Sequence, residues 1–372
     1  MAMQTEWLVP LAQPRQKKRL CELCLGPAHV RCAACLVTYY CDVDHQNADW
    51  VSVHAKICQL LIPLRAAPPF YTSEKERKIG EEQRRNREIF LAEVTYEAAQ
   101  KFLIEGHHED AIPAGLHALK FSISIYGSSA LELVPPYITL AETSLGLGHL
   151  RQGEEYLSQA QWIVLKNSHC SHHVQSKLYR NLGLLHAAKG NLDESLYHFA
   201  NDVYFACCAF GTTNNVAVSG GFFHMANVFS HQNKMDIVDS LYCEVVDLWY
   251  DHFSQFVESQ YQKLITPAEV DLLTVEDRTL VDVLDDRQRS EATQMLNFIL
   301  DFREATLRPQ PEKKAKLLHT LAMFHYLVHD LAKADEFVMR FLQTAQSLPK
   351  RDPNESLYHL VKLIKTKQEW VK

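Results

Sequence analysis

Small side chains recur along the middle of the chain at a nearly constant spacing. Four pairs of residues stand seven positions apart, with successive pairs separated by 42, 42 and 43 residues: Ala99 and Gly106, Ala141 and Gly148, Gly183 and Gly190, Ala226 and Asn233. Twelve residues after each first member comes another, mostly small residue: Ala111, Gly153, Ser195 and Val238. A fifth unit has Ala322, His329 and Ala334 at the same offsets. A period of this length predicts stacked copies of one helical unit.

The unit predicted by this spacing is a helix–turn–helix hairpin. Small residues at the first and third positions let the two helices approach closely, and Gly or Asn between them can end the first helix in the left-handed conformation. Such units bury their apolar faces against their neighbours and stack into an α-solenoid. The repeats cover residues 90–253 and 315–347. They resemble tetratricopeptide repeats but are longer and lack most of the consensus Trp and Pro, so we expect divergent hairpins in a mainly α protein.

Residues 254–314 interrupt the period and are predicted to form a divergent helical insertion. An acidic stretch within it has seven acidic residues and one basic residue between Ala268 and Asp286. Its start, Thr266, Pro267 and Glu269, resembles a helix N-terminus. We interpret the acidic stretch as a solvated face or loop, with a docking site for a basic partner as the alternative. An amphipathic helix is expected over 288–307. Residues 315–372 then contain the fifth unit and a basic C-terminal helix that caps the array.

Residues 61–89, between the repeats and the N-terminal region, are predicted to be a linker followed by a charged helix. Three prolines lie within residues 60–72, and eleven charged residues lie within 73–88. Ser73 and Glu76 have the spacing of a capping box, which marks a helix start. Because charges of both signs are mixed, the simplest interpretation is a solvated helix. The alternative is a contact with an acidic partner or a tubulin-like surface.

The composition limits the class of protein. The chain has 372 residues, of which 47% are hydrophobic and 22% charged, with a net charge of −7. These values are typical of a soluble globular protein, and the scattered basic residues argue against binding to nucleic acid. No apolar run reaches the roughly 18 residues of a membrane helix. The tail of residues 1–18 lacks the apolar core of a signal peptide, so we expect an intracellular protein with reduced cysteines and no membrane partner.

Six of the ten cysteines lie between Cys21 and Cys58. Together with two histidines they make eight soft or borderline ligands in the region 19–60, which is enough for two tetrahedral zinc sites: Cys21, Cys24, Cys32, Cys35, Cys41, His45, His54 and Cys58. The spacings from Cys41 to His45 and from His54 to Cys58 predict pairs on one face of a helical turn. His29 would be a ninth ligand and is left out. A segment this short needs the metal to fold, because it cannot bury enough apolar surface.

The order of these residues, including Tyr40–Cys41 and the spacing of Gln46, Trp50, His54 and Cys58, resembles the MYND-type zinc finger. The resemblance implies interleaved sites: Cys21, Cys24, Cys41 and His45 for the first zinc, and Cys32, Cys35, His54 and Cys58 for the second. His45 stands where the family usually has cysteine. Since four ligands saturate a tetrahedral site, both ions should be structural. The resemblance also implies binding of short proline-containing peptides through Gln46 and Trp50, although Trp50 is equally well explained as a core aromatic.

The sequence is predicted to encode a scaffold or adaptor and not an enzyme. It lacks a phosphate-binding loop, a dinucleotide-binding motif and a nucleophile elbow. Residues 167–170, NSHC, only superficially resemble a lysine methyltransferase motif, which makes such an enzyme a remote alternative. The combination of finger and repeats resembles axonemal MYND-finger proteins. This implies a place in cilia and sperm flagella, with another tetratricopeptide-repeat protein and dynein-arm components as partners. A nuclear transcriptional co-regulator adaptor is the main alternative.

Overall fold

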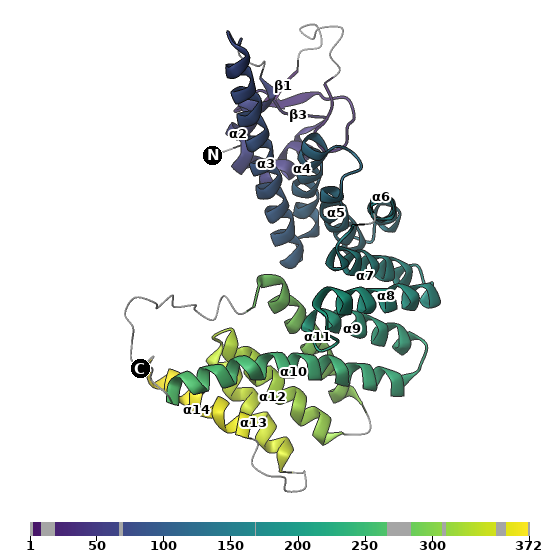
Figure 1. Cartoon of the computed structure of the whole chain (residues 1–372), viewed down its shortest axis with the longest axis vertical. Coiled ribbons are helices and arrows are strands. Elements are labelled where there is room, and N and C mark those ends of the chain that lie inside the picture. Colours follow the sequence, from purple (N-terminus) through teal and green to yellow (C-terminus); the bar gives the residue numbers. More distant parts are fainter. Residues whose placement is uncertain are drawn as a thin grey trace. The chain divides into compact units, whose positions relative to one another are not determined.

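The computed structural model describes residues 3–8, 19–66, 70–167, 169–265, 284–306, 310–346 and 355–370, and within the last range the side chains only as far as residue 368. The chain divides into two compact units, residues 1–191 and 192–372. Helices make up most of the described residues, which confirms the predicted mainly α class (Figure 1). None of these helices is long and apolar enough to cross a membrane.

The first unit begins with the finger. Its three short strands form an antiparallel sheet in the order β1-β2-β3: β1 (Thr5–Trp7), β2 (Val30–Cys32) and β3 (Tyr39–Tyr40). An uninterrupted helical run follows the sheet: α1 (Val43–Asp49), the wide π-helical turn η2 (Trp50–His54) and α2 (Ala55–Arg65). One side of this run faces the sheet, and the other packs on the first repeat hairpin (Figure 1).

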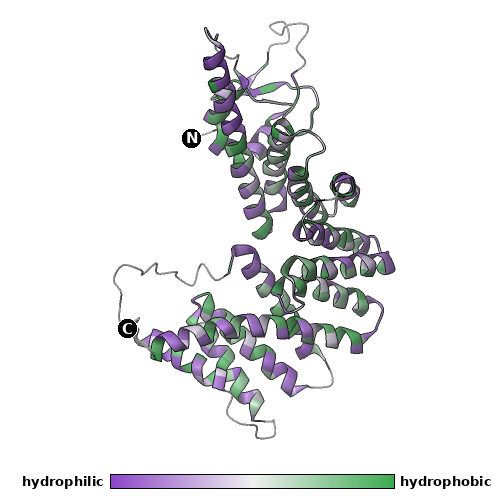
Figure 2. Ribbon diagram, in the orientation of Figure 1, coloured by the Kyte–Doolittle hydropathy of each residue, from purple (hydrophilic) through white to green (hydrophobic). Residues whose placement is uncertain are grey.

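The boundaries predicted for the linker and charged helix at 61–89 differ from the structure. Helix α2 continues to Arg65 because Leu61 and Leu64 are buried in a core that they share with Leu91. The charged helix does not stop at 89. It forms the first part of α3 (Glu74–Ile104), whose second part is the first helix of the repeats. The predicted capping box is confirmed, since Ser73 and Glu76 bond to each other's backbone N–H groups. Figure 2 shows the hydrophilic first part of this helix.

Helix hairpins follow in both units. The first unit contains α3 with α4 (His108–Tyr126), then η3 (Leu131–Leu133), α5 (Val134–Gly146) with α6 (Leu150–Lys166), and α7 (His172–Ala188). The second contains α8 (Leu192–Phe210), α9 (Val216–His231) with α10 (Met235–Ile265), α11 (Asp286–Ala305), α12 (Pro311–Leu327) with α13 (Leu331–Ala345), and α14 (Glu355–Trp370). The predicted array of tetratricopeptide-like hairpins is thus present.

The region predicted to be an insertion at 254–314 begins inside a helix. Helix α10 runs without a break from Met235 to Ile265, because Phe253, Val257 and Tyr261 continue its buried face. The predicted helix start at Thr266 and most of the acidic stretch lie outside the described residues. Helix α11 corresponds to the predicted amphipathic helix, and Asp285 and Gln288 form its capping box. The basic C-terminal helix corresponds to α14, which packs against α10, α12 and α13.

The turn position of each repeat has a left-handed backbone. The φ angle is +79° at Gly106, +75° at Gly148, +80° at Gly190, +57° at Asn233 and +63° at His329. The last two residues carry a Cβ, for which this conformation is unfavourable. All five positions nevertheless have the same left-handed turn. The geometry of the helix hairpin therefore sets this backbone conformation more than the type of residue does.

The small first residue of each repeat is buried between helices. In the fifth repeat Ala322 is fully buried in α12, whereas Ala332 is exposed on α13. We expect Ala322→Leu to lower the free energy of unfolding by about 1–3 kcal/mol, because extra methyl groups cannot enter a packed core without strain. Ala332→Leu is the matched control and should change it by less than about 0.5 kcal/mol. Urea unfolding followed by circular dichroism measures both, and equal stabilities would contradict close packing at this position.

Candidate metal centre

The structure brings the eight predicted ligands together as two groups of four. Within each group, every ligand atom lies within 4.8 Å of the others. The first group contains Cys21, Cys24, Cys41 and His45, and the second contains Cys32, Cys35, His54 and Cys58. These are the interleaved sets that the resemblance implies. His29 is exposed and belongs to neither group.

The sulfur–sulfur distances in both groups suit a tetrahedral zinc ion, whereas Sγ of Cys41 and Nδ1 of His45 are only 2.9 Å apart. A tetrahedron with Zn–S bonds of about 2.3 Å has edges of about 3.8 Å between ligand atoms. The Sγ atoms of Cys24 and Cys41 are 3.7 Å apart, and those of Cys32 and Cys58 are 3.9 Å apart. Nε2 of His54 lies 3.7 Å from Sγ of Cys35. The donor set and its size therefore fit one zinc ion in each group.

Two similar turns hold the first four cysteines. In each C-x2-C pair, the residue after the second cysteine has a left-handed backbone, with φ of +59° at Leu25 and +61° at Leu36. The amide of Leu25 donates to the carbonyl of Cys21, and the amide of Leu36 donates to that of Cys32. Leucine rarely adopts this conformation, so residue type gave no sign of it. The turns direct both thiols of a pair toward one point.

The two i, i+4 pairs differ from each other. His54 ends the turn η2 and Cys58 lies in α2, so this pair is on one helical face as predicted. Cys41 precedes the helix, however, and only His45 is helical. The helical prediction for the first pair was therefore wrong at Cys41. The reason is Asp42, which takes the N-cap position and accepts a hydrogen bond from the amide of His45 at 2.7 Å.

The second group is enclosed, whereas the first is partly exposed. All four residues of the second group are buried, while Cys24 in the first is exposed. The hydrogen bond between Cys32 and Cys35 lowers the pKa of the Cys35 thiol and raises that of the Cys32 thiol. Burial raises the pKa of the Cys41 and Cys58 thiols. The backbone of Gly26 lowers the pKa of the Cys24 thiol. The lowered pKa values favour a thiolate, the form that binds zinc, at Cys24 and Cys35.

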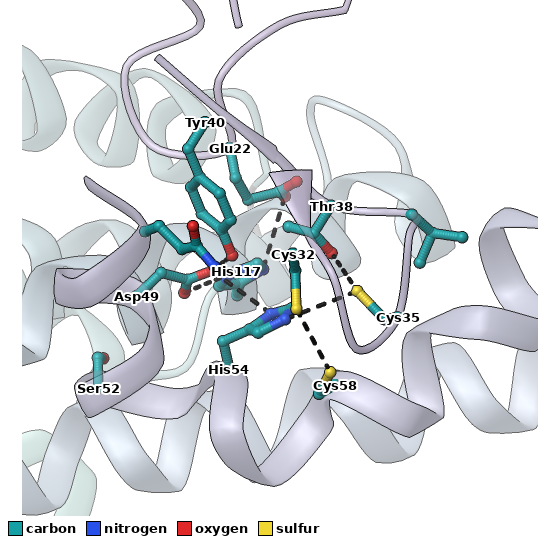
Figure 3. A network of polar contacts seen from close by, with 12 residues as sticks. Glu22, Cys32, Cys35, Thr38, Tyr40, Asp49, Ser52, His54, Cys58 and His117 are labelled. Carbon is teal, nitrogen blue, oxygen red and sulfur yellow. Dashed lines mark hydrogen bonds and ion pairs between the residues drawn. The ribbon is translucent and has the colours of Figure 1, made fainter. Parts of the chain in front are cut away.

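A buried carboxylate lies directly behind the second group. Asp49 is fully buried at the end of α1. Its Oδ2 lies 3.6 Å from Nδ1 of His54 and accepts a 2.6 Å hydrogen bond from the Tyr40 hydroxyl. Its Oδ1 lies 2.9 Å from Nε2 of His117, which belongs to the repeat helix α4 (Figure 3). The contact with His54 is longer than a hydrogen bond, so it brings a carboxylate close to the outer nitrogen of a zinc ligand without bonding to it. Asp49 therefore connects the metal centre to the array.

A second carboxylate reaches the same histidine from the first cysteine pair. Glu22 lies between Cys21 and Cys24, and its Oε1 is 3.7 Å from Nδ1 of His117. It also pairs with both terminal nitrogens of Arg65 at 2.9 Å and with Lys120 at 3.1 Å. Burial raises the pKa of Glu22, but the charges of His117, Arg65 and Lys120 more than offset this and lower it to about 2.

A serine from the finger enters the hydrogen-bond ladder of α4. Oγ of Ser52 donates to the carbonyl of Asp110 at 2.5 Å and accepts from the amide of Ala114 at 3.1 Å. These two backbone groups are the ordinary i, i+4 partners of an α-helix. The sequence did not identify Ser52, Asp49, Glu22 or His117, because the contacts that join the first three to α4 span 58 to 98 residues of the chain.

Gln46 and Trp50, which the resemblance implies in peptide binding, are both buried. Nε2 of Gln46 donates a 2.9 Å hydrogen bond to the carbonyl of Gln4, beside β1. The ring of Trp50 packs in the core of the finger, 5.7 Å from that of His54. The structure thus shows Trp50 as a core aromatic, and binding of a peptide by either residue stays a prediction.

Comparisons with known proteins bear mainly on the finger. The family model of the MYND finger matches residues 21–58. Similar solved structures include the nearly identical TPR-like repeats of a putative kinesin light chain from Podosopora anserina, 13% identical over 69% of this chain and 96% of that one, with a TM-score of 0.35. BtubC (BKLC) from P. vanneervenii is 16% identical over 71% of this chain and 96% of that one, with a TM-score of 0.32.

The chain therefore carries an N-terminal MYND finger whose two clusters fit two structural zinc ions. Four protein ligands leave no coordination position for water or substrate, so each ion would hold segments of chain together. The first zinc would join the first cysteine pair to the start of α1. The second would join the loop after β2 to the helix that packs on the repeats.

We expect purified full-length protein to contain two zinc ions per chain. Cys41→Ala should reduce the content to one, because it removes a ligand from the first group only. His45→Cys should keep two, since thiolate and imidazole both bind zinc well. Elemental analysis by mass spectrometry gives the ratio. An unchanged content in Cys41→Ala would show that Cys41 is not a ligand, and a ratio of one in the unaltered protein would argue against His45.

Asp49→Ala should lower the free energy of unfolding by about 3–5 kcal/mol, because it leaves Tyr40 and His117 buried without their common partner. The matched control is Asp44→Ala, which removes an exposed carboxylate from the same helix. The control should stay within about 0.5 kcal/mol of the unaltered protein. Urea unfolding of the full chain measures both, and equal midpoints would mean that Asp49 does not anchor the finger.

Proposed function

We propose that the protein is a non-enzymatic scaffold that binds other proteins through both its finger and its repeats. The observation that carries the proposal is the Asp49–His117 contact, which fixes the finger on the first hairpin. Two binding surfaces held in one body can bring two partners together at high effective concentration. A finger on a free linker would bind its partner without orienting it.

The chemistry of the clusters supports a structural role for the metal. Each group has four protein ligands, and the second is enclosed in the finger core. Stacked helix hairpins present long surfaces that suit peptides and helices of other proteins. Neither feature supplies a reaction site for a small substrate.

We place the scaffold in the axoneme of motile cilia and sperm flagella. This placement rests on the resemblance of the finger and repeat combination to axonemal MYND-finger proteins. The partners would be another tetratricopeptide-repeat protein of the axoneme and components associated with dynein arms. In that role the protein would support dynein-arm assembly or motility.

Proximity labelling in ciliated cells tests the proposal, because it identifies compartment and partners together. The full chain fused to a biotin ligase should label axonemal proteins, including a tetratricopeptide-repeat partner and dynein-arm components. The Asp49→Ala variant should label them less strongly, and Asp44→Ala should label them as the unaltered chain does. Exclusive labelling of nuclear proteins would overturn the axonemal placement. Stoichiometric binding of S-adenosylmethionine to the purified chain would overturn the non-enzymatic assignment.

A further inference from the structure

Strand β1 occupies an edge of the finger sheet that would otherwise be open. Thr5, Glu6 and Trp7 pair antiparallel with Cys32, Arg31 and Val30 of β2. The other edge of β2 is already paired with β3. The amide of Leu8 donates to the carbonyl of His29 at 2.8 Å, and that of Ala33 donates to the carbonyl of Gln4 at 3.0 Å. Without β1, this edge would present unpaired backbone groups ready to bind another extended segment.

Two side chains of the finger contact β1 and the residue before it. Nε2 of Gln46 donates to the carbonyl of Gln4. The Arg31 guanidinium makes a two-point contact with the Glu6 carboxylate, at 2.7 Å and 2.9 Å. The first contact recognises backbone and would accept any sequence. The Arg31–Glu6 contact recognises a carboxylate at the position opposite Arg31, because the planar guanidinium can bond to both carboxylate oxygens at once.

The strand is held by little apolar contact. Trp7 is 66% exposed, and the side chains of Glu6 and Arg31 are 45% and 27% exposed. Of the described residues of this segment, only Met3 packs against the finger core. A three-residue strand with so few buried contacts opens more easily than the zinc-bound body of the finger.

We propose that β1 is an intramolecular ligand of the finger, and that partners replace it with an extended segment carrying a carboxylate opposite Arg31. The inference rests on the proposed function and deepens it. Gln46, which the resemblance implies in peptide binding, contacts Gln4, the residue before β1. Arg31 would decide which segments bind, and Glu6 would hold the edge closed until a partner competes for it. Attachment to the same chain gives β1 a high effective concentration, so an incoming peptide must overcome this advantage.

The test uses the full-length protein and a labelled synthetic peptide of residues 1–12, MAMQTEWLVPLA, with binding followed by fluorescence anisotropy. Glu6→Arg places two positive charges opposite each other and should open the edge. We expect the peptide to bind this variant roughly two- to fivefold more tightly than the unaltered protein, which corresponds to the loss of one favourable charge pair. Glu82→Arg on the exposed part of α3 makes the same change of charge and is the matched control. It should bind like the unaltered protein.

Arg31→Glu tests the selection of charge. This variant also opens the edge but should no longer bind the peptide, whereas a peptide carrying the E6R change should bind it. The double variant E6R/R31E restores an opposite pair within the chain, so it should be as closed as the unaltered protein. Zinc content equal to that of the unaltered protein shows that each variant keeps its folded finger.

Hydrogen exchange of the Ala33 amide reports the strand independently. Exchange should be faster in E6R and R31E than in the unaltered protein, E82R and E6R/R31E. Equal exchange in all five would show that β1 does not close the edge and would overturn the inference. In E6R, faster exchange without tighter binding of the peptide would also overturn it, because the edge would be open without being a ligand site. Neither result would decide the scaffold proposal. That proposal is tested separately by the labelling experiment, which depends on partners captured in cells.

Discussion

The arrangement of the first unit depends on one buried carboxylate. Asp49 lies between the hydroxyl of Tyr40, the outer nitrogen of the ligand His54 and the ring of His117. An unpaired charge at this depth would cost several kcal/mol, so the fold depends on the hydrogen bonds that Asp49 makes with Tyr40 and His117. The requirement fixes the sheet, the helical run and α4 relative to one another. The contacts of Glu22 and Ser52 with α4 reinforce the same arrangement.

The features that the sequence predicted well are local or periodic. The repeat could be recognised because Ala99, Ala141 and their equivalents occupy the same helical face at a fixed interval, and the capping box at Ser73 and Glu76 lies within four residues. The metal-ligand groups could be proposed because their spacing matches a known finger. The helix boundaries were less accurate. Leu61 and Leu64 extend α2 through tertiary contacts that no local pattern reveals.

The features that the sequence did not predict depend on long-range pairing. His117 is one of nineteen histidines, and nothing near it in the sequence distinguishes it from the others. Its role comes from Asp49 and Glu22, which are far away along the chain. Strand β1 is similar, since three residues carry too little pattern to predict a strand and its partner lies beyond the region 9–18. Left-handed Leu25 and Leu36 go against residue preference and become understandable only with the metal ligands beside them.

The insertion of Ser52 between Asp110 and Ala114 affects how the protein can be divided for experiments. A finger fragment ending near residue 66 would hold both ligand groups, yet its Asp49 and Ser52 would have lost their partners in α4. During synthesis, too, the finger cannot complete its buried contacts until residue 117 has been made, 59 residues after the last zinc ligand. The segment that must fold together is therefore longer than the segment that holds the zinc ligands, because it also includes the first repeat hairpin.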